Sequence, residues 1–195
     1  MMYSIGHSNQ PIEGLLNKLI KYNVEYVADV RSFPRSIRQP WFDSDSLSNS
    51  LADIGVEYLF LGSSLGGRPK DPADMTKGIA NYEVMAAKDK FKRSIDGLLK
   101  LSSRSSIALL CSEHNPLDCH RCLLVSRAMI ELGEDTNHIL RDSELMSQKK
   151  VEQVLAEEYR ASNLDLFMSE DDIRSASYKS RSEKIAYSQA VVEVT

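Results

Sequence analysis

Residues 107–122 read IALLCSEHNPLDCHRC and hold all three cysteines and two of the four histidines of the chain. The stretch opens with the apolar run Ile107-Ala108-Leu109-Leu110, which is typical of a buried strand. Its last residues begin a pattern of helical spacing that continues to residue 132. The loop between a strand and the next helix is where α/β proteins bind ligands. The stretch therefore predicts an α/β fold with a functional site at this loop.

The beginning of the chain repeats the order of strand, polar loop and helix. Residues 2–5 are apolar and lead into Gly6-His7-Ser8-Asn9, and apolar residues then recur at helical spacing over residues 11–22. Residues 24–30 are rich in β-branched and aromatic side chains and predict a second strand. This order of elements predicts a βαβ unit whose two strands are parallel neighbours.

The rest of the chain continues the alternation of helices and strands. The pattern predicts strands over residues 56–61, 106–111 and 137–140, and helices over residues 46–53, 81–87, 89–102, 119–132 and 147–158. Glycine and proline are frequent over residues 62–78, which predicts a long functional loop. We therefore expect one α/β domain with a mostly parallel central sheet over residues 1–162. A C-terminal extension, helical or partly disordered, follows over residues 163–195, with a helix predicted at 173–190.

Composition narrows the class of protein. The chain has 195 residues, of which 42% are hydrophobic and 27% charged, with a net charge of −4, so no global basic field favours nucleic acid. No apolar run reaches the roughly 18 residues of a membrane span, so no membrane contact is predicted. No signal peptide is expected at the N-terminus. Three clustered cysteines are not a disulfide framework and indicate a reducing compartment, so the expected location is the cytoplasm.

Polar residues gather at the ends of three predicted strands. The carboxyl ends of parallel strands meet at one edge of a sheet, which is where ligands bind in open α/β sheets. We therefore predict one composite site that unites His7, Ser8, Asn9, Asp29, Arg31, Ser32, Arg35, Cys111, Glu113, Cys119, His120 and Arg121.

Four ordered motifs carry a resemblance to a known family. They are SIGHSN at residues 4–9, VADVRSFP at 27–34, LGSSLGG at 61–67, and LLCSE at 109–113 followed by CHR at 119–121. With these motifs the chain resembles the domain-of-unknown-function family 488 from Tyr3 to about His138. The resemblance implies a Rossmann-like, three-layer α/β domain with the motifs gathered at one face. The family has no settled activity, so the resemblance strengthens the site and leaves the reaction open.

The cysteines admit three interpretations. Cys119 is predicted near a helix N-terminus beside Arg121, and both features favour a thiolate, so Cys119 and Cys111 could be nucleophile and resolving thiol. They could also bind a metal, or be reduced structural thiols. Neighbouring Cys119 and His120 on one helix are poorly placed to bind the same ion, and the spacing is not a C-x-x-C zinc pattern. We therefore predict no cofactor and no metal ligands, with a divalent metal as the open alternative. Cys122 is assigned to the core.

Acid–base groups and anion-binding groups complete the predicted site. Asp29 or Glu113 is the candidate general base or nucleophile, unless each pairs with an arginine to hold a loop, and His120 is the candidate proton carrier. Guanidinium groups match phosphate bidentately, and glycines permit close backbone approach. The predicted binding residues are therefore Arg31, Arg35, Arg121, Gly66 and Gly67, with His7, Ser8 and Asn9 positioning the substrate.

Three functional hypotheses follow from these residues. The first is an enzyme, a hydrolase or a transferase, that acts on a nucleotide, a nucleic-acid end or another phosphorylated substrate. The second is a thiol-dependent enzyme that uses Cys119 and Cys111. The third is a binding module for nucleic acid or a nucleotide that has no catalytic activity. The sequence makes no prediction of oligomeric state.

Overall fold

A single mixed sheet forms the centre of the protein. The computed structural model describes residues 1–163 and 167–189. Among these, the sheet contains β1 (Met2–Gly6), β2 (Tyr26–Asp29), β3 (Glu57–Phe60), β6 (Ile107–Cys111), β7 (Thr136–Ile139) and β8 (Leu145–Ser147). The order is β3-β2-β6-β1-β7-β8, and only β8 runs antiparallel to its neighbour. The predicted α/β class with a mostly parallel sheet is confirmed.

The strands β1 and β2 are parallel, but the prediction that they are neighbours is wrong. Strand β6 lies between them, with Gly6 beside Cys111 and Asp29 beside Leu110. All five residues of β6 are buried. A fully apolar strand is best accommodated in the middle of a sheet, where helices cover both faces. As a result, the loop after β6 emerges between the other two polar loops.

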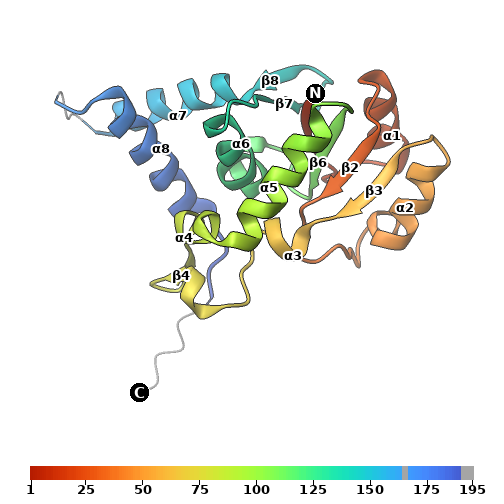
Figure 1. The fold of residues 1–195 in the computed structure, drawn as a ribbon, viewed down its shortest axis with the longest axis horizontal. Helices are drawn as coiled ribbons and strands as arrows, with labels where there is room; N and C mark the ends of the chain where they lie inside the picture. The colour runs from red at the N-terminus through yellow and green to blue at the C-terminus, as the bar shows by residue number, and fades with distance from the viewer. Residues whose placement is uncertain (164–166, 190–195) are drawn as a thin grey trace.

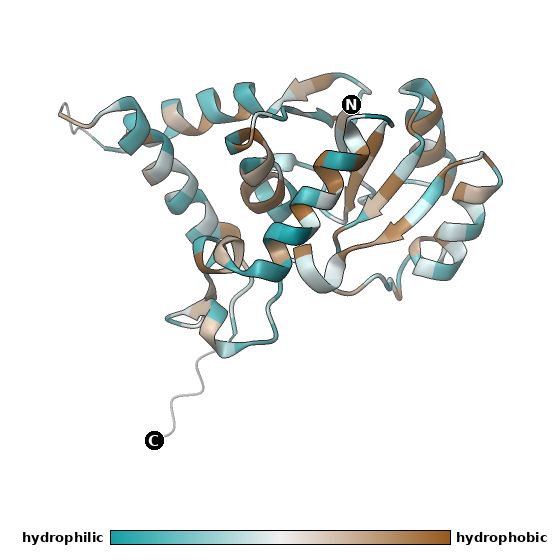
Figure 2. Ribbon diagram, viewed as in Figure 1, coloured by the Kyte–Doolittle hydropathy of each residue, from teal (hydrophilic) through white to brown (hydrophobic). Residues whose placement is uncertain are grey.

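Helices cover both faces of the sheet and complete a three-layer fold. On one face, α1 (Ile12–Lys21) and α2 (Ser44–Ala52) enclose one hydrophobic cluster. On the other face, α5 (Asp89–Ser102), α6 (Arg127–Glu131) and α7 (Gln148–Ser162) enclose a second one. In Figure 1, α5 and α6 lie in front of the sheet, and α7 and α8 (Glu170–Ile185) lie at the opposite end of the molecule from α2. Figure 2 shows apolar residues concentrated in the strands and in the parts of the helices that face them.

The helix predicted over residues 119–132 has a different beginning. A 3₁₀ turn, η3 (Pro116–Asp118), comes first, and Cys119 is extended, with φ −138° and ψ 138°. The first helical segment is a π-helical turn, η4 (Arg121–Ser126), which continues directly into α6. Turns of this kind are rare and occur frequently at functional sites.

The predicted loop over residues 62–78 contains short elements that the sequence pattern did not indicate. They are α3 (Gly62–Leu65), the 3₁₀ turn η2 (Pro72–Asp74) and β4 (Met75–Thr76), which pairs with β5 (Ile79–Ala80). Each has four residues or fewer, so no hydrophobic periodicity can appear in it. The helices predicted at 81–87 and 89–102 are confirmed as α4 (Tyr82–Ala87) and α5.

The described part of the C-terminal extension is helical and docks on the domain. Helix α8 (Glu170–Ile185) packs against α7, and its Tyr178 is buried. Beyond the helix, the Ala80 amide donates to the Tyr187 carbonyl and the Gln189 amide to the Gly78 carbonyl. The last residue of the helix predicted at 173–190 and the end of the extension lie outside the described residues. Among the described helices, none has the length and apolar character needed to cross a membrane.

Candidate functional site

A polar cavity of about 270 Å³ opens at the carboxyl ends of the central strands. Three arginines line it, Arg31, Arg35 and Arg68, and its walls include Cys111, Glu113 and His120. The remaining lining residues are Ser32, Phe33, Gly67, Tyr82, Ser112, Asp118, Ile185 and Tyr187. Seven of the residues predicted for the site line this cavity: Arg31, Ser32, Arg35, Gly67, Cys111, Glu113 and His120.

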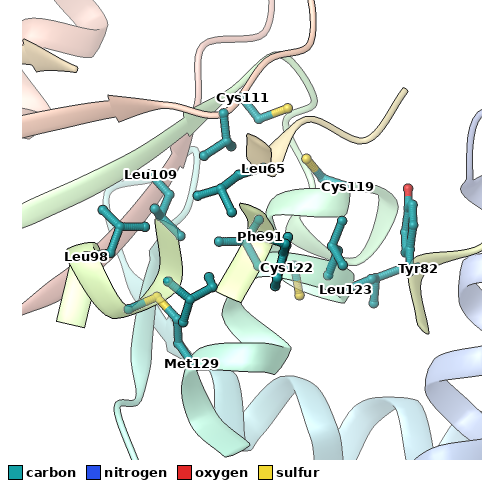
Figure 3. Close-up of a cluster of buried hydrophobic side chains, with 14 of the residues drawn as sticks. Leu65, Tyr82, Phe91, Leu98, Leu109, Cys111, Cys119, Cys122, Leu123 and Met129 are labelled. Carbon is teal, nitrogen blue, oxygen red and sulfur yellow. The ribbon is translucent and has the colours of Figure 1, made fainter. Parts of the chain in front are cut away.

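Two thiols, a carboxylate and an imidazole converge beside this cavity. Cys111 Sγ lies 2.9 Å and Cys119 Sγ 3.2 Å from Glu113 Oε2. His120 Nδ1 lies 3.6 Å from Cys111 Sγ and 4.0 Å from Cys119 Sγ. All four donor atoms lie within 4.8 Å of one another. Figure 3 shows the sulfur atoms of Cys111 and Cys119 directed toward each other, and that of Cys122 directed away. The assignment of Cys122 to the core is confirmed by its full burial.

Backbone contacts fix the orientation of the His120 ring. Nε2 lies 2.9 Å from the Val30 carbonyl oxygen, and because a carbonyl can only accept, Nε2 carries the hydrogen. The lone pair of the neutral ring is therefore on Nδ1, which faces the two sulfur atoms. Gly67 packs against the ring, and a Cβ at this position would lie 2.6 Å from His120 Cγ. Residue 67 must therefore be glycine for the ring to occupy this place.

The electrostatic environment separates the two thiols. Burial raises the pKa of the Cys111 thiol well above its ordinary value, and contact with Cys119 adds to the effect. Burial opposes ionisation of Cys119 as well, but the hydrogen bond from Cys111 and the charge of Arg121 outweigh it, and the pKa of Cys119 is well below its ordinary value. Burial also raises the pKa of the Glu113 carboxyl group. The pair therefore favours one thiolate, on Cys119.

Arg121 is a structural clamp within the site. Its side chain is fully buried and donates to the backbone carbonyl oxygens of Glu113 (2.6 Å) and His114 (3.0 Å) and to Ser4 Oγ (3.2 Å). The alternative in which the Glu113 carboxylate pairs with Arg121 is not what the structure shows, because the guanidinium binds the backbone of the loop instead. Arg121 does not line the described cavity, so its predicted role in binding an anion is not supported by its position.

Asp29 and Arg31 form a buried ion pair, with Arg31 Nη2 2.6 Å from Asp29 Oδ2. Arg31 Nε and the Tyr58 hydroxyl also donate to the Asp29 carboxylate. Asp29 is fully buried and is not among the described residues that line the cavity. The hydrogen bonds of Asp29 match the alternative in which the carboxylate holds a loop through Arg31.

The loop after β1 contributes to the packing of the site and not to its wall. His7 stacks on Phe42 with the ring centroids 4.3 Å apart, and its Nε2 lies 3.3 Å from Arg31 Nη1. Among the described residues, the cavity lining does not include His7, Ser8 or Asn9. Their predicted contact with a substrate therefore has no support in the geometry.

The loop after β2 and the glycine-rich loop approach each other closely at the cavity. Ser32 Oγ accepts a hydrogen bond from the Arg68 amide. A Cβ on Gly66 would lie 2.5 Å from Ser32 Oγ, so this approach requires glycine. Of the predicted binding residues, Ser32, Arg35 and Gly67 line the cavity, whereas Gly66 is not among its described lining residues.

Tyr82, Ile185 and Tyr187 are among the lining residues that were not predicted from the sequence. Ile185 and Tyr187 belong to the C-terminal extension and lie more than sixty residues beyond the last predicted site residue, Arg121. The docking of α8 and the hydrogen bonds of the following segment to residues 78–80 bring these two residues to the cavity.

Comparisons with known proteins place the chain in a family without extending its function. A comparison with curated proteins and one with solved structures each find no significant match. A family model described as "Domain of unknown function DUF488" matches residues 11–128. This match covers more than half of the chain and includes the glycine-rich loop and the cysteine-containing stretch. The chain therefore belongs to the family described as Domain of unknown function DUF488.

Proposed function

We propose that this cavity is the active site of an enzyme that acts on a phosphorylated substrate by hydrolysis or group transfer. One observation carries the proposal: Glu113, a carboxylate, shares a cavity of about 270 Å³ with the arginines Arg35 and Arg68. Such a cavity matches a nucleotide or sugar phosphate better than a long nucleic acid, which the net charge of −4 also disfavours.

The positive charge available to an anion comes from Arg35 and Arg68. Within the described part of the chain, neither forms a salt bridge, whereas Arg31 is held by Asp29. The carboxylate of Asp118 is bound by Arg181, at 2.6 Å. Two guanidinium groups therefore remain to bind a phosphate, and a forked guanidinium fits the phosphate geometry well.

Glu113 is the proposed acid–base group of the reaction. Glu113 lines the cavity, and its Oε2 lies 2.9 Å from Cys111 Sγ and 3.2 Å from Cys119 Sγ. A carboxylate with a raised pKa is suited to accept a proton from an attacking water or hydroxyl group and return it to the leaving group. The Nδ1 lone pair of His120 faces the thiols, so we assign the proton transfers of the reaction to Glu113 and not to His120.

A thermal-shift screen of nucleotides, sugar phosphates and short single-stranded nucleic acids tests this proposal. A ligand at 100 times its Kd contributes about 2.7 kcal/mol, which for a chain of this length raises the melting temperature by about 5–10 °C. We expect a shift with a small phosphorylated compound and a loss of this shift in Arg35→Ala and Arg68→Ala.

Arg93→Ala is the matched control, because Arg93 is an exposed arginine of α5 outside the cavity. It should bind the compound as the wild type does. The proposal would be contradicted if no phosphorylated compound binds, or if a compound shifts the melting temperature of Arg35→Ala and Arg68→Ala as much as that of the wild type. A ligand that binds through Arg35 and Arg68 but undergoes no reaction would favour a binding module over an enzyme.

A further inference from the structure

The cluster of Cys111, Glu113, Cys119 and His120 contains donor types that suit a soft or borderline metal ion. In a tetrahedral zinc site with bonds of about 2.0–2.3 Å, ligand atoms are separated by about 3.3–3.8 Å. Here the imidazole lies 3.6 and 4.0 Å from the two sulfur atoms, and all four donors lie within 4.8 Å. Glu113 Oε2 lies closer to the two sulfur atoms, at 2.9 and 3.2 Å. The distances within the cluster are therefore close to those of a tetrahedral site, with the carboxylate slightly nearer to the sulfur atoms than in such a site.

The backbone explains how two adjacent residues can point at one ion. The objection from the sequence assumes that Cys119 and His120 belong to the same helix, where their side chains would diverge. Instead, Cys119 is extended, and the helical conformation begins only at His120, with φ −60° and ψ −26°. This change of conformation turns both side chains toward Cys111 at the end of β6.

The surroundings of the cluster orient its ligands. Metal-binding histidines almost always donate their second ring N–H to a carbonyl or a carboxylate. The hydrogen bond from His120 Nε2 to the Val30 carbonyl has this form, and Gly67 supports the ring from the other side. These contacts leave Nδ1 as the free ligand atom.

Charge balance favours a divalent cation. Two buried thiolates and the carboxylate of Glu113, an exposed residue, would carry three negative charges, and the buried Arg121 supplies one positive charge beside them. A divalent ion would neutralise the remainder. Thiolate and imidazole ligands select Zn²⁺ over Mg²⁺ or Ca²⁺, which prefer oxygen.

We propose that Cys111, Cys119 and His120 bind a Zn²⁺ ion, with Glu113 at an exchangeable fourth position that faces the cavity. The site deepens the proposed function and rests on it for the claim that the ion meets a substrate. Three protein ligands and one exchangeable position are typical of catalytic zinc sites, where the ion supplies a Lewis acid or an activated water. The binding of the ion itself is independent of the substrate.

The full-length, reduced protein would be stripped with a chelator and titrated with Co²⁺ and Zn²⁺. We expect one equivalent of cobalt to produce thiolate charge-transfer absorption and the intense visible bands of a tetrahedral complex, and zinc to displace it. Cys111→Ala and Cys119→Ala should each weaken zinc binding by at least 100-fold. Cys122→Ala is the matched control, since Cys122 is equally buried but its thiol faces Gln148; this variant should bind as the wild type does.

A second pair of variants tests the site without removing a ligand. Gly67→Ala should displace the His120 ring and weaken zinc binding about tenfold or more, in keeping with the effect of altered second-shell contacts. In Gly97→Ala the added Cβ meets no atom within 4 Å, so zinc binding should be unchanged. Lack of thiolate absorption in wild-type protein loaded with cobalt would overturn the proposal, even if the cysteine variants fail to fold. So would equal zinc affinity in Cys119→Ala and Cys122→Ala.

The outcomes for metal and substrate are separable. The Arg35→Ala and Arg68→Ala variants could bind zinc while no form of the protein binds a phosphorylated ligand. This result would uphold the zinc site and contradict the proposed function. A phosphorylated ligand that binds through these arginines while cobalt and zinc do not bind would retain the proposed function. In that case the zinc site is wrong and the thiol pair becomes the candidate nucleophile.

Discussion

Asp29 and Arg31 show at the scale of single residues why a polar motif need not be catalytic. The motif predicts a base and an anion-binding group, yet in the structure the two side chains bind each other at a relative exposure of 0% and 3%. The Tyr58 hydroxyl occupies another lone pair of the carboxylate. The pair fixes the direction in which the chain leaves β2, and this direction places Ser32 and Arg35 at the cavity.

Replacement of Asp29 by alanine tests this structural role. Asp29→Ala would leave the Arg31 guanidinium buried without its partner, which typically costs about 3–5 kcal/mol of unfolding free energy. Urea denaturation measures the change. Asp96→Ala, at an exposed position of α5, should alter stability by less than about 0.5 kcal/mol. An Asp29→Ala protein of normal stability that has lost its reaction would instead return Asp29 to the role of a base.

At the scale of elements, the segment that joins β6 to α6 decides the geometry of the site. Local sequence favours a regular helix from residue 119, but the helical segment starts as a π-helical turn at Arg121. The reason is tertiary: the buried Arg121 guanidinium binds the Glu113 and His114 carbonyl oxygens, which draws the loop back over the start of the helix.

Helix α8 supports the same loop from outside. Arg181 donates to the Leu117 carbonyl oxygen at 3.1 Å and to Asp118 Oδ1 at 2.6 Å. Because the extension also supplies Ile185 and Tyr187 to the cavity wall, it belongs to the site and is more than an appendage to it.

Arg181→Ala is expected to loosen the site loop locally. Both partners are partly exposed, so the loss of global stability should stay below about 1 kcal/mol. Amide hydrogen exchange over Pro116–Asp118 should accelerate several-fold, because the turn loses its contact with α8. Arg174→Ala removes an exposed i,i+3 ion pair on the same helix and should not change exchange there. Equal protection of the turn in both variants would contradict this role of α8.

At the scale of the whole molecule, two buried histidines make stability depend on pH. His138 is a buried residue with both ring nitrogens hydrogen-bonded: Nε2 lies 2.6 Å from Gln148 Oε1 and Nδ1 2.6 Å from Ser4 Oγ. Burial and the charge of Arg121 lower the pKa of His138 to about 4. Burial lowers the pKa of His7 to about 4 as well. The hydrogen bond to the Ser8 carbonyl opposes this effect, and the charge of Arg31 adds to it.

Unfolding free energy should therefore fall as the pH is lowered. Each ring has a lower pKa in the folded than in the unfolded chain, so only the unfolded chain gains protons as the pH falls from about 6.5 to about 4. Each histidine accounts for a loss on the order of 3 kcal/mol over this range, and no further loss below it. Urea denaturation at pH 7 and pH 4.5 measures the change. His138→Gln should lose less stability between these two values than the wild type, whereas an equal loss would show that His138 is not buried as described.

Amphipathic helices and apolar strands were predicted well, and the shortest strands were not. The amphipathic spacing of α1 and α5 and the apolar run of β6 are properties of the local sequence, so these elements lie within a residue or two of their predicted positions. Strands β4, β5 and β8 have only two or three residues each, which is too few to show a period. Among the site residues, Cys111, Glu113, His120 and Arg35 were predicted and line the cavity, but their roles remain predictions.

The sequence by itself determined the α/β class, the parallel sheet and the clustering of polar residues at its carboxyl edge. Hydrophobic periodicity, and the position of polar residues directly after a strand, are both properties of neighbouring residues in the chain. Only the tertiary structure decided that β6 lies between β1 and β2, that Arg121 and Asp29 turn inward, and that α8 closes the cavity. Each of these depends on which buried charge finds a partner and which apolar surface is covered. Such contacts join residues far apart in the chain, and no local pattern records them.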